Sequence, residues 1–443
     1  MFKALRRYLW VSQSFLSRHS RLIWRTAGII LGVILLFFLF ARYLPTPKQS
    51  YRIARVGKYN LVDLPIDIQN EVSLGLVTVD DEGVVHPALA SQFSLSDDGL
   101  TYTFTLDPQL SWHNGTRVVH ADITYNFNDV EVSSGSDTVI YKLKEPFAPF
   151  YSAVSKPLLK KNKFGVGEYR ITKSVLGNGV LQKLIIESDT VRKIYKFYPT
   201  ESSALTAYKL GEVDIVDGLT LYPESFNSDP TTSINNSQIS RRHTVLFFNN
   251  NDSILTSKPT RQALAYAIKD KTHGSTRQPS PISINSWAYN PLVKTYDFDL
   301  PRAQNLFNQE NPNKNSVKLE IKTMLSYLDL AESIASDWRE AFGVEVSVKV
   351  VSNIADDYQI LLADFAPPTD PDQYTIWHST QPTNFTHYSN LKVDQLLEDG
   401  RRTSNLKLRR ELYQDFQRFL LEDSPAVFLF ASNSYTLERK PIF

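Results

Sequence analysis

The chain has 443 residues, of which 42% are hydrophobic and 21% are charged, and its formal net charge is +1. This is the composition of a globular protein long enough to form more than one domain or lobe, and the near-neutral charge argues against a nucleic-acid partner, which would need a clear excess of basic residues. The absence of cysteine excludes disulfides, thiolate metal sites, a cysteine nucleophile and a lipid carried on an N-terminal cysteine.

The first predicted element is an apolar run over residues 26–41, which contains no charged residue and is bracketed by Arg25 and Arg42. Extended to residues 22–44, the run is about long enough to cross a bilayer if both arginines snorkel to the membrane surfaces. We therefore predict a single transmembrane helix at residues 22–44, which would anchor the chain in the cell membrane.

Basic residues predict the orientation of this helix. Six lysines and arginines precede residue 26, so the positive-inside rule places a tail of residues 1–21 in the cytoplasm and, after a linker at residues 45–50, the body of the chain outside. A cleaved signal peptide is the alternative. Against it, the basic segment before the apolar run is unusually long, and no small-x-small cleavage site follows Phe40.

Beyond the linker the chain becomes mixed and rich in strand patterns. Residues 101–106 alternate between apolar and polar side chains, and residues 138–143 form a second strand-like run. Residues 201–210 predict a helix, with Thr200 as its N-cap and Gly211 just past its end.

The second half shows a clearer alternation of strand and helix. Residues 317–323 alternate as a strand, residues 330–342 repeat apolar side chains at helical spacing, and residues 344–350 alternate again. Strand, helix and strand at this spacing form a βαβ unit, which predicts an α/β region with parallel strands. Residues 407–421 predict a further amphipathic helix, which Pro425 ends. Residues 427–430 predict a last strand.

Some ten short motifs occur in a fixed order across residues 51–443. They include Pro87-Ala88-Leu89-Ala90, Trp112-His113-Asn114-Gly115, Leu210-Gly211-Glu212-Val213-Asp214-Ile215, Arg261-Gln262-Ala263-Leu264-Ala265-Tyr266-Ala267-Ile268 and Asp370-Pro371-Asp372. Together they closely resemble the family of extracellular solute-binding proteins, family 5, which includes the oligopeptide-, dipeptide- and nickel-binding proteins of ABC importers. Each motif is weak alone, but their common order makes chance a poor explanation.

The resemblance implies an α/β fold of the periplasmic-binding-protein type II, with two lobes that close on a ligand about a hinge. Lobe I would comprise residues 51–244 and 425–443, with a reduced accessory subdomain at about 97–150, and lobe II would comprise residues 245–424. The implied function is capture of a small peptide or peptide-like solute by a monomer, which delivers it to the permease subunits of an ABC transporter.

The loop over residues 364–377 is the predicted ligand-binding segment, because loops placed by a rigid α/β scaffold concentrate binding residues. In peptide-binding members of the family an aspartate after the lobe II strand pairs with the ligand's α-ammonium. Asp364 resembles it, although its spacing to Asp370-Pro371-Asp372 is longer than in the family; a solvated or loop-capping role is the alternative. Further predicted ligand contacts are Trp377, Ser379, Asn384 and Trp287.

Other functions remain open at this stage. The same lobes serve sensors that dock to a separate membrane partner, and the ligand of this family is in some members a sugar or a metal complex. A hydrolase is the third alternative, but no carboxylate pairs with a base at an interpretable spacing. The eight histidines show no metal-binding pattern, so we expect no enzyme activity, no metal and no cofactor.

Overall fold

The computed structural model describes residues 48–352 and 357–440, together with residues 10, 18, 20–21, 24–26 and 28–35. Residues 28–35 are helical. Within these described stretches, no helix combines the length and the apolar character needed to span a membrane. Much of the predicted transmembrane helix, including residues 36–44, lies outside the described residues, as does most of the predicted tail.

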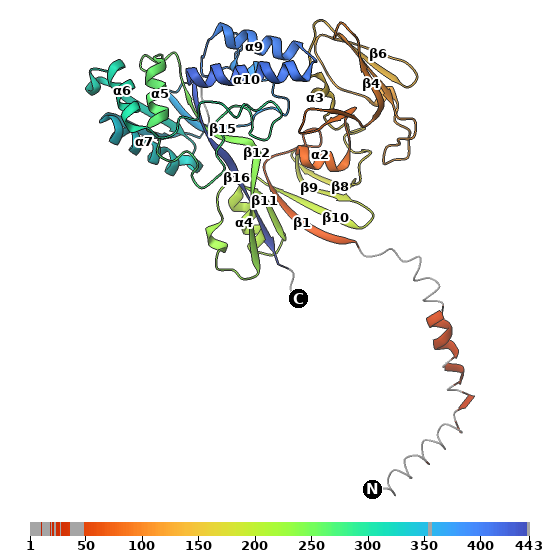
Figure 1. The fold of residues 1–443 in the computed structure, drawn as a ribbon. Helices are drawn as coiled ribbons and strands as arrows, with labels where there is room; N and C mark the ends of the chain where they lie inside the picture. Colours follow the sequence, from red (N-terminus) through yellow and green to blue (C-terminus); the bar gives the residue numbers. More distant parts are fainter. Residues whose placement is uncertain are drawn as a thin grey trace. The chain divides into compact units, whose positions relative to one another are not determined.

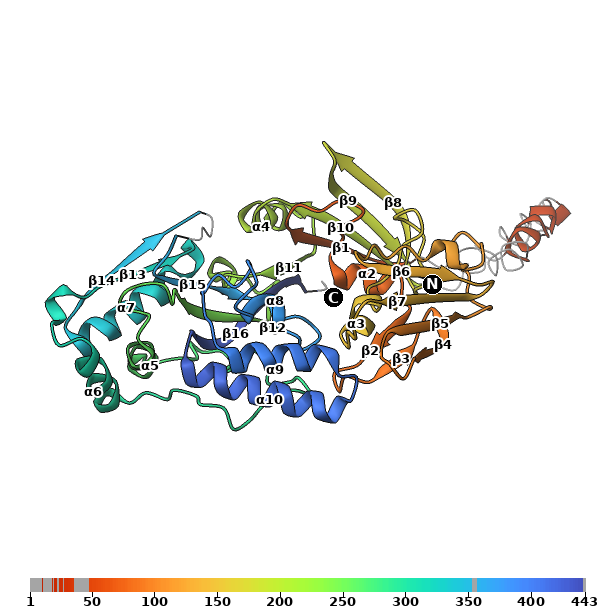
Figure 2. The same ribbon diagram turned by 90° about the horizontal axis from the view of Figure 1, so that it is seen from above.

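A ten-stranded mixed sheet runs through the body of the chain (Figures 1 and 2). In spatial order its strands are β14 (Glu345–Val350), β13 (Lys318–Thr323), β15 (Ile360–Phe365), β12 (Thr232–Phe248), β16 (Ala426–Arg439), β11 (Ile215–Leu219), β1 (Gln49–Val56), β10 (Val191–Tyr198), β9 (Val180–Glu187) and β8 (Arg170–Gly177). Two smaller sheets pair β2 (Val77–Val79) with β3 (Val85–Pro87), and order β4 (Ala90–Leu95), β5 (Thr101–Leu106), β7 (Thr138–Leu143) and β6 (Val130–Ser134).

The α-helices from residue 66 onward are α2 (Ile66–Val72), α3 (Phe150–Val154), α4 (Glu201–Lys209), α5 (Lys258–Ala267), α6 (Leu300–Glu310), α7 (Leu328–Phe342), α8 (Tyr374–Trp377), α9 (Leu391–Arg402) and α10 (Leu406–Asp423). Most predicted elements are confirmed, some with shifted ends. The strands at residues 101–106 and 138–143 are β5 and β7, and the helix predicted over residues 201–210 is α4. Its N-cap Thr200 accepts a hydrogen bond from the backbone of Ser203, as predicted.

The predicted βαβ unit is β13, α7 and β14. β13 and β14 are parallel, from Lys318 opposite Glu345 to Thr323 opposite Val350. The helix ends where Gly343 adopts a φ of 70°, a conformation that glycine takes without a steric cost. Trp338 on its inner face is fully buried, and its indole N–H donates to the carbonyl of Leu264 at 2.9 Å.

Separate hydrophobic cores lie on the two sides of the central strands β12 and β16. Two clusters are built from residues between 245 and 430. Three others are built from residues between 54 and 226, together with Leu437. Below, residues 50–231 are called the N-terminal part and residues 249–425 the C-terminal part, and β12 and β16 run through both (Figure 2).

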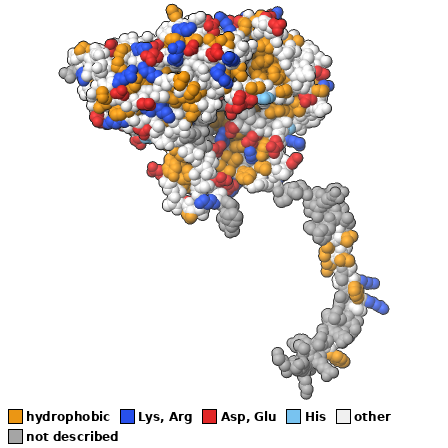
Figure 3. Space-filling model, viewed as in Figure 1, with side chains coloured by type: hydrophobic (Ala, Val, Ile, Leu, Met, Phe, Trp, Pro, Cys, Tyr) orange, Lys and Arg blue, Asp and Glu red, His pale blue; other side chains and the backbone are white. Residues whose placement is uncertain are grey.

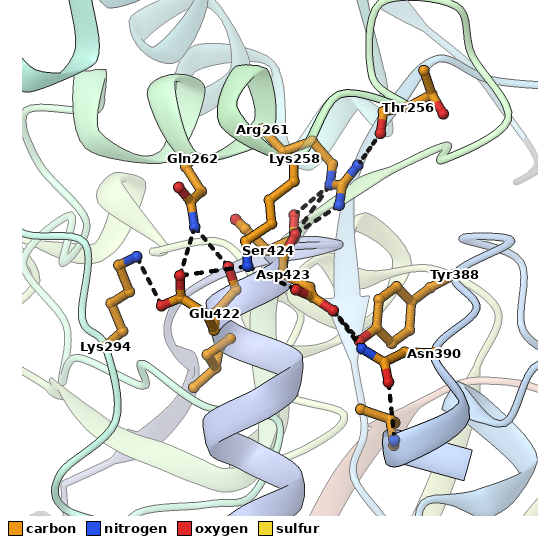
Figure 4. Close-up of polar contacts among 12 residues, drawn as sticks. Thr256, Lys258, Arg261, Gln262, Lys294, Tyr388, Asn390, Glu422, Asp423 and Ser424 are labelled. Carbon is orange, nitrogen blue, oxygen red and sulfur yellow. Dashed lines mark hydrogen bonds and ion pairs between the residues drawn. The ribbon is translucent and has the colours of Figure 1, made fainter. Parts of the chain in front are cut away.

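A buried arginine explains the Arg261 motif (Figure 4). Its guanidinium donates to four backbone carbonyls, those of Leu255, Thr256, Asp423 and Ser424, at 2.7–3.2 Å. Two of these carbonyls lie at the C-terminal end of α10, where a positive charge complements the helix dipole. This contact therefore fastens α5 to α10, and α10 forms one wall of the cavity described below.

Two further cations lie just after α5, one buried and one partly buried. Lys271 is 7% exposed, and its ammonium donates to the carbonyl of Ile268 at 2.6 Å. Arg277 donates to the carbonyls of Phe428 and Leu429 in β16. Burial, and secondly repulsion from Arg277, lowers the pKa of Lys271 to about 7.

This shift predicts a pH-dependent stability. An unfolded lysine has a pKa near 10.4, so unfolding takes up a proton between about pH 7 and 10, and the free energy of unfolding rises with pH by about 1.4 kcal/mol per unit in that range. This contribution is fully present above about pH 10 and is lost progressively as the pH falls to the folded pKa of Lys271. We expect Lys271→Met to abolish that slope, as measured by chemical denaturation at several pH values. Lys392→Met, at an exposed site in α9, is the control, and identical slopes in wild type and Lys271→Met would contradict the assignment.

Candidate functional site

A cavity of about 190 Å³ lies between the N-terminal and C-terminal parts. The N-terminal part contributes the β2–β3 turn, Tyr102 of β5, and residues in and just before α3. The C-terminal part contributes residues 282–287 (except Ile284), most of residues 367–373, and the start of α10. Figure 2 shows β2, β3 and α3 beside the ends of α9 and α10, and Figure 1 also shows α3 at that place. The cavity is therefore bounded by segments that are far apart in sequence.

Aromatic rings form much of its wall. Tyr102 and Tyr151 meet edge to face with ring centroids 5.1 Å apart, and the Tyr102 hydroxyl donates to the carbonyl of Phe147 at 2.9 Å. Trp287 comes from the opposite part and lies against Gly83, where a Cβ atom would be 2.5 Å from the indole nitrogen. Gly83 also has a φ of 80°, so a glycine is needed there both for the turn and for the approach of Trp287.

The charges that line the cavity are mainly acidic. Arg409 forms a bidentate ion pair with Asp370, with contacts of 2.5 and 3.0 Å. Although burial opposes it, the attraction of Asp370 raises the pKa of Arg409. Among the described lining residues Arg409 is the only cation, and this pair neutralises it. The other two carboxylates of the lining belong to Asp80 and Asp81. Asp80 contacts His86 at 2.7 Å, and this contact lowers the pKa of Asp80. Asp81 is exposed.

The acidic character is local to the cavity. On the face of the body seen in Figure 3, acidic and basic side chains are interspersed, in keeping with the net charge of +1. A ligand with a positively charged group is therefore favoured by the cavity itself, and aromatic faces add to that preference through cation–π attraction.

Asp364 does not line this cavity. It lies near the end of β15, opposite Thr244 of β12. One carboxylate oxygen accepts hydrogen bonds from the hydroxyls of Tyr327, at 2.5 Å, and Ser432, at 2.8 Å. The other oxygen is 3.6 Å from the guanidinium of Arg242, and 26% of the side chain is exposed. Asp364 thus links β15, β12 and β16 and still presents part of its carboxylate to solvent.

Trp377 is placed inside a hydrophobic core. Its side chain is 1% exposed and packs among Phe247, Phe365 and Phe428. Its indole N–H donates to the side chain of Gln373 at 2.8 Å. In this structure Trp377 supports the cavity wall through Gln373 and does not itself line the cavity. Trp287 is the predicted contact residue that does line it.

Ser379 and Asn384 lie in the segment that follows Trp377, and both make contacts within the C-terminal part. The Ser379 hydroxyl donates to Asp394 of α9 at 2.6 Å. The side-chain amide of Asn384 donates to the carbonyl of Tyr388 at 2.8 Å. The structure therefore brings Asn384 close to Trp377, 3.5 Å from the Trp377 carbonyl, but places neither Ser379 nor Asn384 in the cavity wall. Ligand contact by either residue stays a prediction.

Sequence reasoning missed Tyr102, Tyr151 and Arg409. Each sits within an ordinary pattern: Tyr102 on the buried face of β5, Tyr151 in α3, and Arg409 within an amphipathic helix. Only the fold brings these distant segments together. The one visible signal was the acidic turn Asp80-Asp81 between two short strands, which by itself is typical of any exposed hairpin.

The Arg409–Asp370 pair predicts a large stability effect. Asp370→Asn would leave the Arg409 side chain, only 6% exposed, without a counter-charge, at a cost of roughly 3–5 kcal/mol in the free energy of unfolding. Asp415→Asn is the matched control, because Asp415 pairs with Arg418 on the exposed face of the same helix and such pairs contribute about 0–1 kcal/mol. Equal losses for the two variants in urea denaturation would contradict the buried-pair interpretation.

Comparison with known proteins agrees with this architecture. Residues 84–146 and 191–387 match the middle region of the bacterial extracellular solute-binding proteins, family 5. The probable D,D-dipeptide-binding periplasmic protein DdpA of Escherichia coli is 22% identical over 80% of each chain. The oligopeptide-binding protein AppA of Bacillus subtilis is 21% identical over 85% of this chain and 84% of its own.

Solved structures show the same fold. NikZ of Campylobacter jejuni, in complex with Ni(L-His), superposes with a TM-score of 0.73 and 24% identity over 89% of this chain and 95% of its own. CtaP of Listeria monocytogenes, an ABC transporter substrate-binding protein, gives a TM-score of 0.75 over 89% and 94% of the two chains. The chain therefore has the two-lobed α/β fold of periplasmic binding proteins and belongs to the bacterial extracellular solute-binding proteins of family 5.

Proposed function

We propose that this protein captures a short peptide or peptide-like solute with a free ammonium group outside the cytoplasmic membrane and delivers it to the permease of an ABC importer. The protein binds and releases the solute without chemical change. The observation that carries the proposal is the cavity between the two parts, which has aromatic walls and several carboxylates. Among the described lining residues the only cation is Arg409, and Asp370 neutralises it.

The size of the cavity supports a short solute. Its volume of about 190 Å³ is below the ~300–1,000 Å³ of pockets that enclose drug-sized molecules. A dipeptide or tripeptide suits such a space better than a long oligopeptide. The peptide-related names of the Escherichia coli and Bacillus subtilis relatives agree with this substrate class.

We assign lobe I to residues 51–244 and 425–443, and lobe II to residues 245–424. Separate hydrophobic cores support two lobes, although residues 426–430 at the start of β16 pack in the two cores of the C-terminal part. The ladder between β12 and β16 changes register between Gln238 and His243, close to the proposed boundary. An irregularity at that point suits a hinge, because a bulge interrupts the stiffness of a regular ladder.

Asp364 is our proposed contact for the ligand's α-ammonium. It does not line the cavity, but it lies three residues before Pro367, which does. An ammonium enclosed between closed lobes needs a carboxylate partner, since an unpaired buried charge is costly. Asp364 is partly exposed, and the oxygen that faces Arg242 at 3.6 Å has room for a shorter, charge-assisted contact. The acidic turn at Asp80-Asp81 would attract the same group during entry.

Asp364→Asn tests this contact. We expect the affinity for trialanine to fall more than tenfold in isothermal titration calorimetry, since losing one partner of a buried charge pair costs roughly 2–5 kcal/mol. N-acetyl-trialanine should bind the wild type poorly and lose little more on Asp364→Asn. Asp415→Asn controls for net charge, as Asp415 is exposed in α10. Equal binding of free and acetylated peptide to the wild type would rule out the ammonium contact.

We further propose that residues 22–44 cross the cell membrane once, with the tail of residues 1–21 in the cytoplasm. The uncharged run at residues 26–41 and the basic residues before it support this arrangement. Protease added to intact cells should release the body, and N-terminal sequencing of the intact protein should begin at or near Met1. A mature form that starts near Tyr43 would show cleavage instead of anchoring.

A further inference from the structure

The Asp370-Pro371-Asp372 motif is joined to two helices by two separate ion pairs. Asp370 pairs with Arg409 of α10, and Asp372 accepts a hydrogen bond from Arg401 of α9 at 2.9 Å. The carboxylate of Asp372 is 9% exposed. Burial raises its pKa, and Arg401 opposes that rise. Both carboxylates of the motif are thus engaged within the C-terminal part, where they hold this wall of the cavity.

Arg401 also reaches the N-terminal part. Its guanidinium lies between two rings, 3.9 Å from the ring centroid of Tyr374 in its own part and 5.1 Å from that of Phe147 in the other. The backbone carbonyl of Arg401 accepts a hydrogen bond from the backbone N–H of Ala148 at 2.7 Å. One residue therefore contacts Asp372 and Tyr374, which flank Gln373 of one cavity wall, and Phe147 and Ala148 at the other wall.

The neighbouring arginine provides a contrast. Arg402 lies 3.6 Å from Glu145 and 3.9 Å from Glu398, and half of its side chain is exposed. It carries the same charge and approaches the same N-terminal segment. Such exposed pairs contribute little. By contrast, the Arg401 side chain is 23% exposed and its guanidinium lies over aromatic faces, a geometry that lysine cannot reproduce.

We infer that Arg401 is a positioning residue that holds the two lobes closed over the cavity by stacking between Tyr374 of one lobe and Phe147 of the other. The Phe147 contact and the Ala148 hydrogen bond form only when the lobes meet. They therefore stabilise the closed state relative to the open state, and they slow the release of a bound solute without touching it. The expected effect of Arg401 on a bound solute rests on the proposed function. Its expected effect on lobe closure does not.

Closure can be measured without any ligand, because the chain has no cysteine and two can be introduced for spin labels. Glu131→Cys in β6 and Glu411→Cys in α10 place labels at exposed positions in the two lobes. In the full-length chain in detergent, we expect Phe147→Leu and Arg401→Lys each to shift the electron-electron distance distribution toward longer distances. Arg402→Lys should leave it as in the wild type. An unchanged distribution in both Phe147→Leu and Arg401→Lys would overturn the inference.

Release kinetics supply the second readout. The dissociation rate of trialanine should rise about threefold to thirtyfold in Phe147→Leu or Arg401→Lys, the range expected for a partly desolvated cation–π contact. The dissociation rate of the double variant should rise no further than that of the single variant with the larger effect, because both substitutions remove the same contact. Additive effects of the two substitutions on the dissociation rate would assign Arg401 a merely structural role. So would a fall in the unfolding midpoint large enough to explain the faster dissociation. If trialanine fails to bind the wild type, the proposed substrate is wrong, and the spin-label distances still decide the role of Arg401.

Discussion

The antiparallel pairing of β12 with β16 holds the N-terminal and C-terminal parts of the body in one sheet. The ladder runs from Thr232 opposite Arg439 to Phe247 opposite Ala426, and it is continued by β15 on one side and β11 on the other. Because these two long strands run through both the N-terminal and the C-terminal parts, each part can build its own core while the sheet remains continuous. The cavity between the two parts lies beside this shared sheet.

The electrostatics of that cavity depend on charge neutralisation. Without Asp370, the buried Arg409 would present a cation to any ligand. The bidentate pair removes this cation and leaves the carboxylates of the β2–β3 turn to define the local charge. The same aspartate-rich motif fastens α9 and α10, so one short loop sets both the shape and the charge of the cavity. The resulting preference for a cationic group is a property of the site and not of the whole chain.

The local elements were largely predictable from the sequence, and the site was largely not. β5, β7, α4, α7 and the parallel pair β13 and β14 follow from apolar periodicity and end signals such as Thr200 and Gly343, which act within a few residues. The predicted strand at the C-terminus was too short, because β16 extends to Arg439 through pairing with β11 and β12, partners that local patterns do not reveal.

The candidate site depends on tertiary packing in the same way. Trp287 was predicted as a contact and lines the cavity. Trp377, also predicted as a contact, is buried among Phe247, Phe365 and Phe428. Both indoles lie beside loops, so their local sequence patterns do not distinguish them. The packing of distant strands decides whether an indole lines the cavity or is buried in the core. Asp364 likewise gains Tyr327 and Ser432 as neighbours through strand pairing alone.

The most direct test of the central claim is native mass spectrometry of the full-length protein purified in detergent, with and without a cation placed in the cavity by Ser283→Lys, since Ser283 lines the cavity. The wild type should carry short peptides with free amino termini. Ser283→Lys should lose them while it remains folded, because the added ammonium repels that of the ligand. A sugar or a metal complex bound to the wild type, or peptides retained undiminished by Ser283→Lys, would show that the cavity does not select a cationic peptide terminus.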